Sequence, residues 1–281
     1  MLATGLVHLF PPKHHTRAIR VLDDVLAVEP TNVTALMGRA YIHQFANRWE
    51  DAADFFSKAA EQVPEDNVET GLVAREEHAW CQAQLGNYEV AAEALHSIQE
   101  HIEVLDGYEE RKARVWWRLG QCHWYLGGMH IIDGCYISTN LCLLDMEKSY
   151  KHFITALKRS PSFAPAFTSL GLYYLEGASP SDPTRATKCF QKAFELDARE
   201  TEAAKRLAHS FAEERDWDLV EVVVKRTIEG EGGLGGGLTS EEANAIAKHK
   251  PTNSWAWKAL GVVELVSKII IDTYHIIRAF L

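Results

Sequence analysis

One set of residues recurs in this sequence after an interval of 34 residues, and this repeat restricts the possible folds more than any other feature. Ala18, Val25 and Pro30 reappear in register as Ala52, Ala59 and Pro64. Proline lacks the backbone N–H that a helix interior needs, so each proline marks the end of a helical segment. An interval of this length holds one pair of helices, and such a pair buries its apolar face only against a neighbouring pair. The repeat therefore predicts a stack of antiparallel helix pairs.

The stretch Ser149–Tyr174 contains the end of one such pair and the beginning of the next. Phe153, Ala156 and Leu157 lie at helical spacing, and Pro161 ends that helix. The helix that follows has apolar residues in the size order large, large, small, large, namely Phe167, Leu170, Gly171 and Tyr174. This order is typical of the tetratricopeptide (TPR) repeat, in which small residues let two helices cross closely. The sequence thus predicts an all-α fold, a TPR α-solenoid that forms a right-handed superhelix of antiparallel helix pairs.

The TPR pattern extends over residues 1–265, as about six units followed by a truncated seventh. Residues 230–240 are rich in glycine but lack the spacing of a dinucleotide or phosphate loop, so we expect a linker there. Residues 266–281 depart from the TPR pattern, and codons compatible with a splice donor at their start favour read-through into an intron. Because the seventh unit lacks its second helix, we expect low solubility from its uncovered apolar residues. These are Trp255, Trp257, Val262 and Val263.

Residues 129–145 interrupt the fourth unit, between the expected helix end at Gly127–Gly128 and the point where the pattern resumes at Met146. They are rich in Ile, Leu, Cys and Tyr, and we expect no helical organisation in them. One interpretation is a partner-binding loop and another is a tolerated insertion. We favour a third, a translated intron, because the boundary residues permit codons that contain donor, branch and acceptor signals. Removal of these residues keeps the reading frame and restores the repeat.

Composition excludes several classes of partner. The net charge of -10 disfavours broad electrostatic binding to nucleic acid or to an anionic membrane. The five cysteines contain no CxxC pair, which favours free thiols in a reducing cytoplasm or nucleus. The N-terminal residues lack the basic region and the long apolar core of a secretory signal. The C-terminal apolar stretch is interrupted by Glu264, Lys268, Asp272 and Arg278 and therefore makes a poor membrane anchor.

The residue types needed for catalysis are present, but their spacing does not predict an active site. The neighbouring pairs His14–His15 and Cys122–His123 have side chains that diverge on a helix, which argues against a shared metal. The acidic pairs Glu76–Glu77 and Glu213–Glu214 are read as ordinary helix surface. Neither a nucleophile elbow nor a Walker motif occurs. We therefore expect a non-enzymatic chain without cofactor or metal.

Function should then lie on the concave face, which the first helices of the units form. Aromatic residues and arginine are enriched at binding hot spots, and six inward positions, all but one of them aromatic or arginine, form the candidate protein-binding site. The six are Trp80, Arg114, Trp117, Gln121, Trp124 and Tyr125, with Trp117, Trp124 and Tyr125 the densest aromatic group. Further inward positions are Met37, Tyr41, Glu76, Leu172, Lys205 and His209. Helix-to-helix core packing is the alternative role for each of these side chains.

Several long segments resemble more than a generic TPR protein. They are RVWWRLGQCHWYLGG, EKSYKHFITALKRSPSFAPAFTSLGLYY, KCFQKAFELDARETEAAKRLAHSFAEERDWDLVEVVVKRTIE and WAWKALGVVEL. Together they resemble the TPR subunit of the superkiller complex, the superkiller protein three family in its fungal-like form, over about Thr16–Leu265. The resemblance implies a cytoplasmic scaffold that holds the superkiller RNA helicase and a WD40-repeat subunit and assists the RNA exosome in 3′-to-5′ mRNA decay. It also implies a partial chain, an internal portion from the N-terminal half that lacks the partner-binding C-terminal arm.

Two other functions remain open at this stage. A TPR co-chaperone or peptide-binding adaptor would need cations and amides at its clamp positions, which here hold Met37/Tyr41, Glu76/Trp80, Trp117/Gln121 and Thr168/Leu172. The required cations are therefore absent from those positions. A regulatory TPR array from an enzyme whose catalytic domain is missing is the second alternative.

Overall fold

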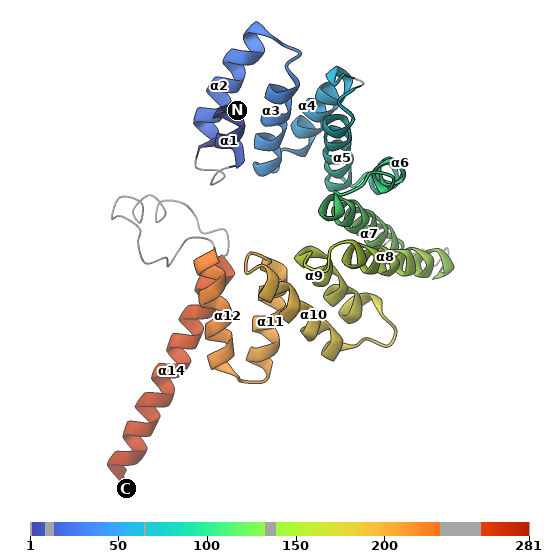
Figure 1. Ribbon diagram of the computed structural model, residues 1–281. Coiled ribbons are helices and arrows are strands. Elements are labelled where there is room, and N and C mark those ends of the chain that lie inside the picture. Colours follow the sequence, from blue (N-terminus) through green and yellow to red (C-terminus); the bar gives the residue numbers. More distant parts are fainter. Residues whose placement is uncertain (1, 9–13, 65, 133–138, 231–253, 281) are drawn as a thin grey trace. The chain divides into compact units, whose positions relative to one another are not determined.

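The computed structural model describes residues 2–8, 14–64, 66–132, 139–230 and 254–280, and these residues fold into helices joined by turns and short loops (Figure 1). The chain divides into two compact units, Met1–Ser160 and Pro161–Leu281. The first unit contains α1 (Leu2–His8), α2 (His15–Val28), α3 (Val33–Phe45), α4 (Trp49–Gln62), α5 (Val68–Gln84), α6 (Tyr88–Glu103), α7 (Glu109–Ile132) and α8 (Thr139–Arg159). The second contains α9 (Ala164–Leu172), the short π-helix η1 (Tyr173–Gly177), α10 (Pro183–Leu196), α11 (Thr201–Glu213), α12 (Trp217–Gly230) and α14 (Ser254–Phe280).

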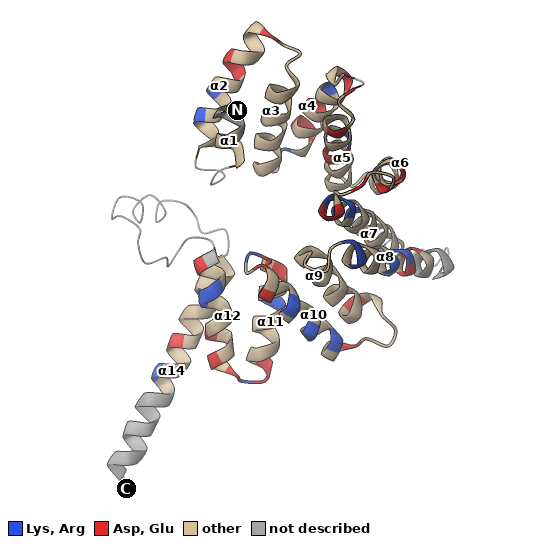
Figure 2. Ribbon diagram, viewed as in Figure 1, with Lys and Arg blue, Asp and Glu red and all other residues tan. Residues whose placement is uncertain are grey.

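Within each unit, helices that follow one another along the chain pack together, from α2 to α8 in the first and from α9 to α14 in the second. The predicted all-α TPR architecture is therefore confirmed. Acidic and basic residues are interspersed along most of these helices (Figure 2). Among the described residues, the helices are too short or too polar to cross a lipid bilayer.

Short polar residues and left-handed turns define the helix ends. The side chains of Asn32, Asn67 and Asp182 accept hydrogen bonds from backbone N–H groups in the first turns of α3, α5 and α10. Asn47 and Gly86 have positive φ angles of 55° and 90° between the two helices of a pair, which is the common way to end a helix. Capping side chains therefore begin several helices of the repeat, and residues with positive φ angles form the turns within two of the pairs.

The small residues of the repeat lie where two helices cross. A Cβ atom added to Gly120 of α7 would lie 2.4 Å from Cε1 of Phe153 in α8. A Cβ added to Gly171 of α9 would lie equally close, 2.4 Å, to Cε1 of Phe190 in α10. Each phenyl ring therefore occupies the space that any larger residue would need. This contact is the physical basis of the large, large, small, large pattern.

The expectation that residues 129–145 lack helical organisation is wrong. Helix α7 continues to Ile132 and α8 already begins at Thr139, so the segment lengthens both helices of the fourth pair. Asp145 is 6% exposed, and its carboxylate lies 3.1 Å from Nδ1 of His123 in α7. The helical parts contain no proline, so their backbone N–H and C=O groups can pair within the two longer helices. The origin of the segment as a translated intron stays a prediction.

The second unit ends with α12 and α14. The β-branched run Val222–Val224 is helical within α12, and the glycine-rich residues predicted as a linker lie outside the described residues after Gly230. Helix α14 packs against α12 through Ala256 and Val263, which are 0% and 2% exposed. Helix α14 continues without a break past residue 266. The predicted boundary between the TPR array and the non-TPR tail therefore does not coincide with the end of a helix.

Candidate protein-binding face

The six candidate residues all come from two neighbouring helices of the first unit. Trp80 belongs to α5, and the other five belong to α7, where Arg114, Trp117 and Gln121 follow at intervals of three and four residues. Residues at this spacing share one side of a helix. Helix periodicity thus gathers most of the predicted site on one side of α7.

Trp80 and Trp117 form the aromatic centre of this face. Their ring centroids are 5.4 Å apart and the ring planes are tilted by 40°. The guanidinium carbon of Arg118 lies 5.1 Å from the Trp80 centroid, within the range of a cation–π contact. Both indoles are half-buried, so they form a fixed aromatic surface rather than two freely rotating side chains.

Arg114 stands beside this pair. Its side chain is half-buried, and among the described residues it forms no ion pair or side-chain hydrogen bond. Its charge still acts over a longer range, because it lowers the pKa values of Glu76, Glu77 and Tyr41, although burial and nearer charges have larger effects on each. Arg114 therefore adds a positive charge to the same side of α7 as Trp117.

Tyr125 does not join the aromatic centre. It is 45% exposed and stacks on Tyr88 of α6, with centroids 5.0 Å apart and planes within 14°. Trp124 and Gln121 are half-buried on α7. The structure thus brings Trp80 and Trp117 together and pairs Tyr125 with Tyr88, which is not one of the six candidate residues. We call Trp80, Arg114 and Trp117 the α5–α7 face. Its role in binding stays a prediction.

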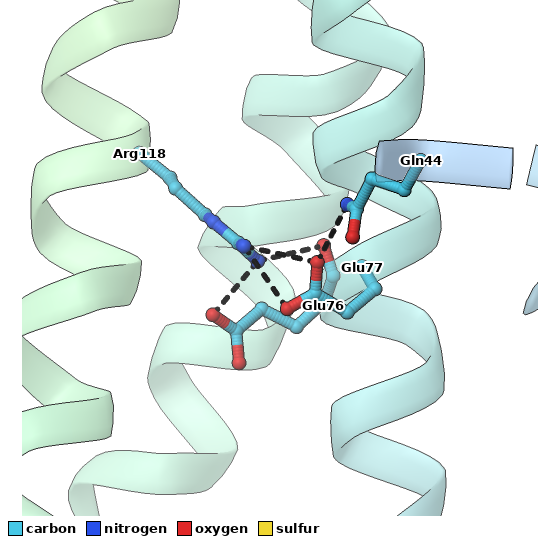
Figure 3. Close-up of polar contacts among 4 residues, drawn as sticks. All are labelled: Gln44, Glu76, Glu77 and Arg118. Atoms are coloured by element: carbon cyan, nitrogen blue, oxygen red, sulfur yellow. Dashed lines mark hydrogen bonds and ion pairs between the residues drawn. The ribbon is translucent and has the colours of Figure 1, made fainter. Parts of the chain in front are cut away.

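A buried charged cluster lies beside the face, and it corrects the reading of Glu76–Glu77 as helix surface (Figure 3). Glu76 and Glu77 are 1% and 4% exposed, and Arg118 is 6% exposed. Arg118 donates from Nη1 to Glu76 Oε1 at 2.9 Å and from Nη2 to both oxygens of Glu77 at 3.0 Å. Gln44 of α3 donates to Glu77 at 3.0 Å. The cluster therefore joins three helices, α3, α5 and α7, and its Arg118 contacts Trp80 of the candidate face.

The two carboxyl groups of this cluster respond to burial in opposite ways. Burial raises the pKa of Glu76, and the nearby Arg118 guanidinium only partly opposes this effect. Burial also opposes ionisation of Glu77, but the Arg118 charge and the hydrogen bonds from Gln44 and Arg118 outweigh it, so the pKa of Glu77 lies below its usual range. Glu77 is thus the firmly ionised partner of Arg118. A proton is more readily taken up by Glu76.

The structure also places the other residues that the sequence singled out. Within the residues that the structure describes, no group of three or more His, Cys, Asp or Glu could hold a metal ion. Glu213 and Glu214 are exposed, as predicted. Of the other inward positions, Met37, Tyr41 and Leu172 pack against apolar clusters, whereas Lys205 and His209 are exposed on α11.

Comparison with known proteins relates the chain to one group of sequences. No family model matches it. It is 33% identical over 267 residues to Superkiller protein 3 of Schizosaccharomyces pombe, an alignment that covers 95% of this chain and 17% of that protein. It is 27% identical over 266 residues to Superkiller protein 3 of Saccharomyces cerevisiae, covering 94% of this chain and again 17% of the relative. Tetratricopeptide repeat protein 37 of Xenopus laevis is 32% identical over 139 residues, 48% of this chain and 8% of that protein. The resemblance to superkiller protein three is confirmed, for a segment that spans about a sixth of the length of those relatives.

Solved structures support the fold. TTC0263, a thermophilic TPR protein of Thermus thermophilus, gives a TM-score of 0.56 at 16% identity and covers 83% of this chain and all of its own. The APC/C hetero-tetramer Cut9–Hcn1 gives a TM-score of 0.53 at 13% identity over 89% of this chain and 39% of the matched chain. The chain therefore has the fold of a TPR repeat protein.

Proposed function

We propose that this chain, which is similar over almost its whole length to part of Superkiller protein 3, is a scaffold segment that assists the cytoplasmic RNA exosome in 3′-to-5′ mRNA decay. The observation that carries the proposal is the 33% identity over 95% of the chain. Its partners are then other proteins, namely the superkiller RNA helicase, the WD40-repeat subunit and the exosome. The net charge of -10 fits this role, because a scaffold of this kind meets RNA through its partners rather than through a basic surface.

We place the partner contact on the α5–α7 face. Tryptophan and arginine dominate the binding energy of many interfaces, because they combine a large contact area with directional contacts. Trp80 and Trp117 form a half-buried aromatic surface, and Arg114 lies next to it without an ion pair among the described residues. A partner segment with one apolar and one acidic side chain would match these groups. The buried cluster of Glu76, Glu77 and Arg118 fixes the two helices that carry them.

A pulldown with the full chain tests this assignment. The tagged chain is immobilised and incubated with a fungal cell extract, and the retained proteins are identified by mass spectrometry. The helicase, the WD40-repeat subunit and exosome subunits should be enriched roughly tenfold or more over a tag-only control. Trp117→Ala and Arg114→Glu should each lower this recovery to near the tag-only level, since a hot-spot loss of about 2 kcal/mol weakens affinity about 30-fold.

Arg111→Glu is the matched control for Arg114→Glu. Arg111 lies on the same helix, but its guanidinium already contacts Glu69 at 3.6 Å, so its reversal should change recovery by less than about twofold. Failure of the folded chain to retain any of the three partners would contradict the proposed function. Retention that is equally sensitive to both reversals would move the contact away from the α5–α7 face.

A further inference from the structure

The connection between η1 and α10 is three residues longer than the corresponding turn of three other helix pairs. In those pairs, the first buried residue of the second helix follows the small residue of the repeat pattern in the first helix after 12 positions. The three intervals are Ala40–Ala52, Ala79–Ala91 and Ala208–Val220. In the α9–α10 pair, Gly171 and Ala186 are 15 positions apart, and both are buried. The additional residues therefore lie in the connection and leave the helix crossing intact.

The connection loops out between η1 and α10 and is fixed at its two ends (Figure 1). The backbone N–H groups of Ala178 and Asp182 donate to carbonyl oxygens of η1, each at 2.8 Å. Between these two anchors lie Ser179, Pro180 and Ser181, and all three are exposed. Neither serine forms a backbone or side-chain hydrogen bond with another residue that the structure describes. We call Ser179, Pro180 and Ser181 the Ser179 loop.

An exposed segment of this kind can bind in the cleft of a protein kinase. The residues around the acceptor hydroxyl have to enter that cleft in an extended conformation, so they must be free of helical and tertiary hydrogen bonds. The Ser179 loop meets this condition while the chain stays folded. Pro180 follows Ser179 directly, and proline at this position is the recognition element of the proline-directed kinases. Because proline has no backbone N–H, it leaves no unpaired donor in the loop.

The same tripeptide occurs a second time, at Ser160–Ser162, in a different structural setting. Ser160 is half-buried, and its backbone N–H donates to the carbonyl oxygen of Ala156 in the last turn of α8, at 2.9 Å. The end of α8 would have to open before a kinase could bind Ser160 in an extended conformation. The two copies therefore share the sequence Ser-Pro-Ser but differ in their accessibility in the folded chain.

The charges near the Ser179 loop are compatible with an added phosphate. Glu176 pairs with Arg206 at 2.9 Å, and Asp182 pairs with Arg185 at 3.2 Å. The two carboxylates that flank the loop in sequence are thus already compensated by arginines. Arg185 is 68% exposed and lies in the first turn of α10, where the helix dipole also favours a negative group. A phosphate on the loop can therefore be compensated without rearrangement of the helices.

We propose that Ser179 is a phosphorylation site for a proline-directed protein kinase. In the transfer, Oγ of Ser179 forms a bond to the γ-phosphorus of ATP, and the bond from that phosphorus to the β–γ bridging oxygen breaks. ADP leaves, and the proton of the hydroxyl passes to a base of the kinase. The product carries a charge of about −1.5 to −2 at neutral pH. The modification changes the surface of the second unit and is independent of the α5–α7 face.

Phosphorylation of the full chain in vitro tests this site. The folded chain is incubated with ATP and a purified mitogen-activated protein kinase, and initial rates at Ser179 and Ser160 are measured by quantitative mass spectrometry. Two peptides, residues 174–184 and 155–165, are phosphorylated in parallel and give the ratio of the two rates without the fold. The ratio of Ser179 to Ser160 should be at least about 10-fold higher in the folded chain than in the peptides, because only Ser160 needs local opening.

Variants of the chain supply the controls. Ser179→Ala should remove most of the incorporated phosphate, whereas Ser160→Ala should leave incorporation within about twofold. Pro180→Ala should lower the rate at Ser179 by at least about 10-fold, since the kinase recognises the proline. Lack of phosphate at Ser179 of the folded chain, under conditions in which the peptide 174–184 is phosphorylated, would overturn the proposal. Equal rate ratios in the chain and in the peptides would overturn it as well, because the fold would then not select Ser179.

Discussion

Replacing Arg118 with methionine should destabilise the first unit by about 3–5 kcal/mol at neutral pH, the cost of leaving a buried charge without its partner. Arg118 lies 2.9 Å from Glu76 and 3.0 Å from Glu77, and all three side chains are less than a tenth exposed. Two unit charges about 4 Å apart at an effective dielectric constant of about 20 attract by about 4 kcal/mol, which agrees with that range. Methionine retains most of the aliphatic volume of arginine, so the change removes charge and hydrogen bonds more than packing.

The loss of stability caused by Arg118→Met should become smaller as the pH falls. In the wild-type chain burial acts against both carboxylates, but Arg118 keeps the pKa of Glu77 below its usual range. Without Arg118, burial acts unopposed by that charge and the pKa values of Glu76 and Glu77 both rise. A carboxyl group whose folded pKa is raised takes up a proton more readily when folded than when unfolded, so the stability of the variant increases as the pH falls toward about 5. The wild-type chain gains less, because Glu77 stays ionised.

Urea unfolding followed by far-UV circular dichroism at about pH 7 and about pH 5 measures both effects. Arg111→Met serves as the control, because its contact with Glu69 is longer, at 3.6 Å, and that carboxylate is 54% exposed. It should cost less than about 1 kcal/mol at either pH. Equal losses for the two variants, or a loss for Arg118→Met that does not depend on pH, would refute this account of the cluster.

Two further substitutions test the helix crossings. Gly120→Ala should cost about 1–3 kcal/mol because its methyl group would overlap Phe153, whereas Gly128→Ala, with open space around it, should be neutral or stabilising by up to about 1 kcal/mol; thermal melts of the two variants should therefore shift in different directions. Ser149 is 0% exposed and its hydroxyl has no hydrogen-bond partner among the described residues, so Ser149→Ala should raise the free energy of unfolding by up to about 1 kcal/mol. A decrease in the unfolding midpoint of Ser149→Ala would show that the hydroxyl is satisfied by water.

The helices could be predicted from periodicity because their apolar residues recur about once per helical turn. A proline or glycine then marks where many of the helices end. The pairing of Gly120 with Phe153 follows from the same rule, since both residues occupy fixed places in the repeat. Local spacing was sufficient for these features because the repeat makes local and tertiary patterns agree.

The helical extension through residues 129–132 and 139–145 could not be predicted from the repeat, which expects a turn seven residues after Gly120. Asn47 and Gly86 do turn the chain seven residues after Ala40 and Ala79, but α7 continues past this point to Ile132. A departure from the repeat does not by itself predict a departure from helical structure, because apolar residues without proline are compatible with a longer helix.

The buried cluster was missed for a different reason. Glu76 and Glu77 have no local signal for burial, since their partner Arg118 lies more than 40 residues away in sequence. On the candidate face, Trp80 and Trp117 were both predicted as inward positions of the repeat, and their rings do meet. Tyr125 is close to Trp117 in the sequence and was predicted to lie in the same aromatic group. Its position on α7 instead brings it against Tyr88 of α6.

The cluster also bears on how the first unit unfolds. In an ordinary repeat array, stability is a sum of contributions from each repeat and from each pair of neighbours, so terminal repeats can open while central ones stay folded. Here Glu77 contacts Gln44 of α3 and Arg118 of α7 at once, which makes two successive interfaces depend on one carboxylate. Helices α3, α5 and α7 should therefore exchange their amide hydrogens as one cooperative block, and damage at any of the three should loosen the other two.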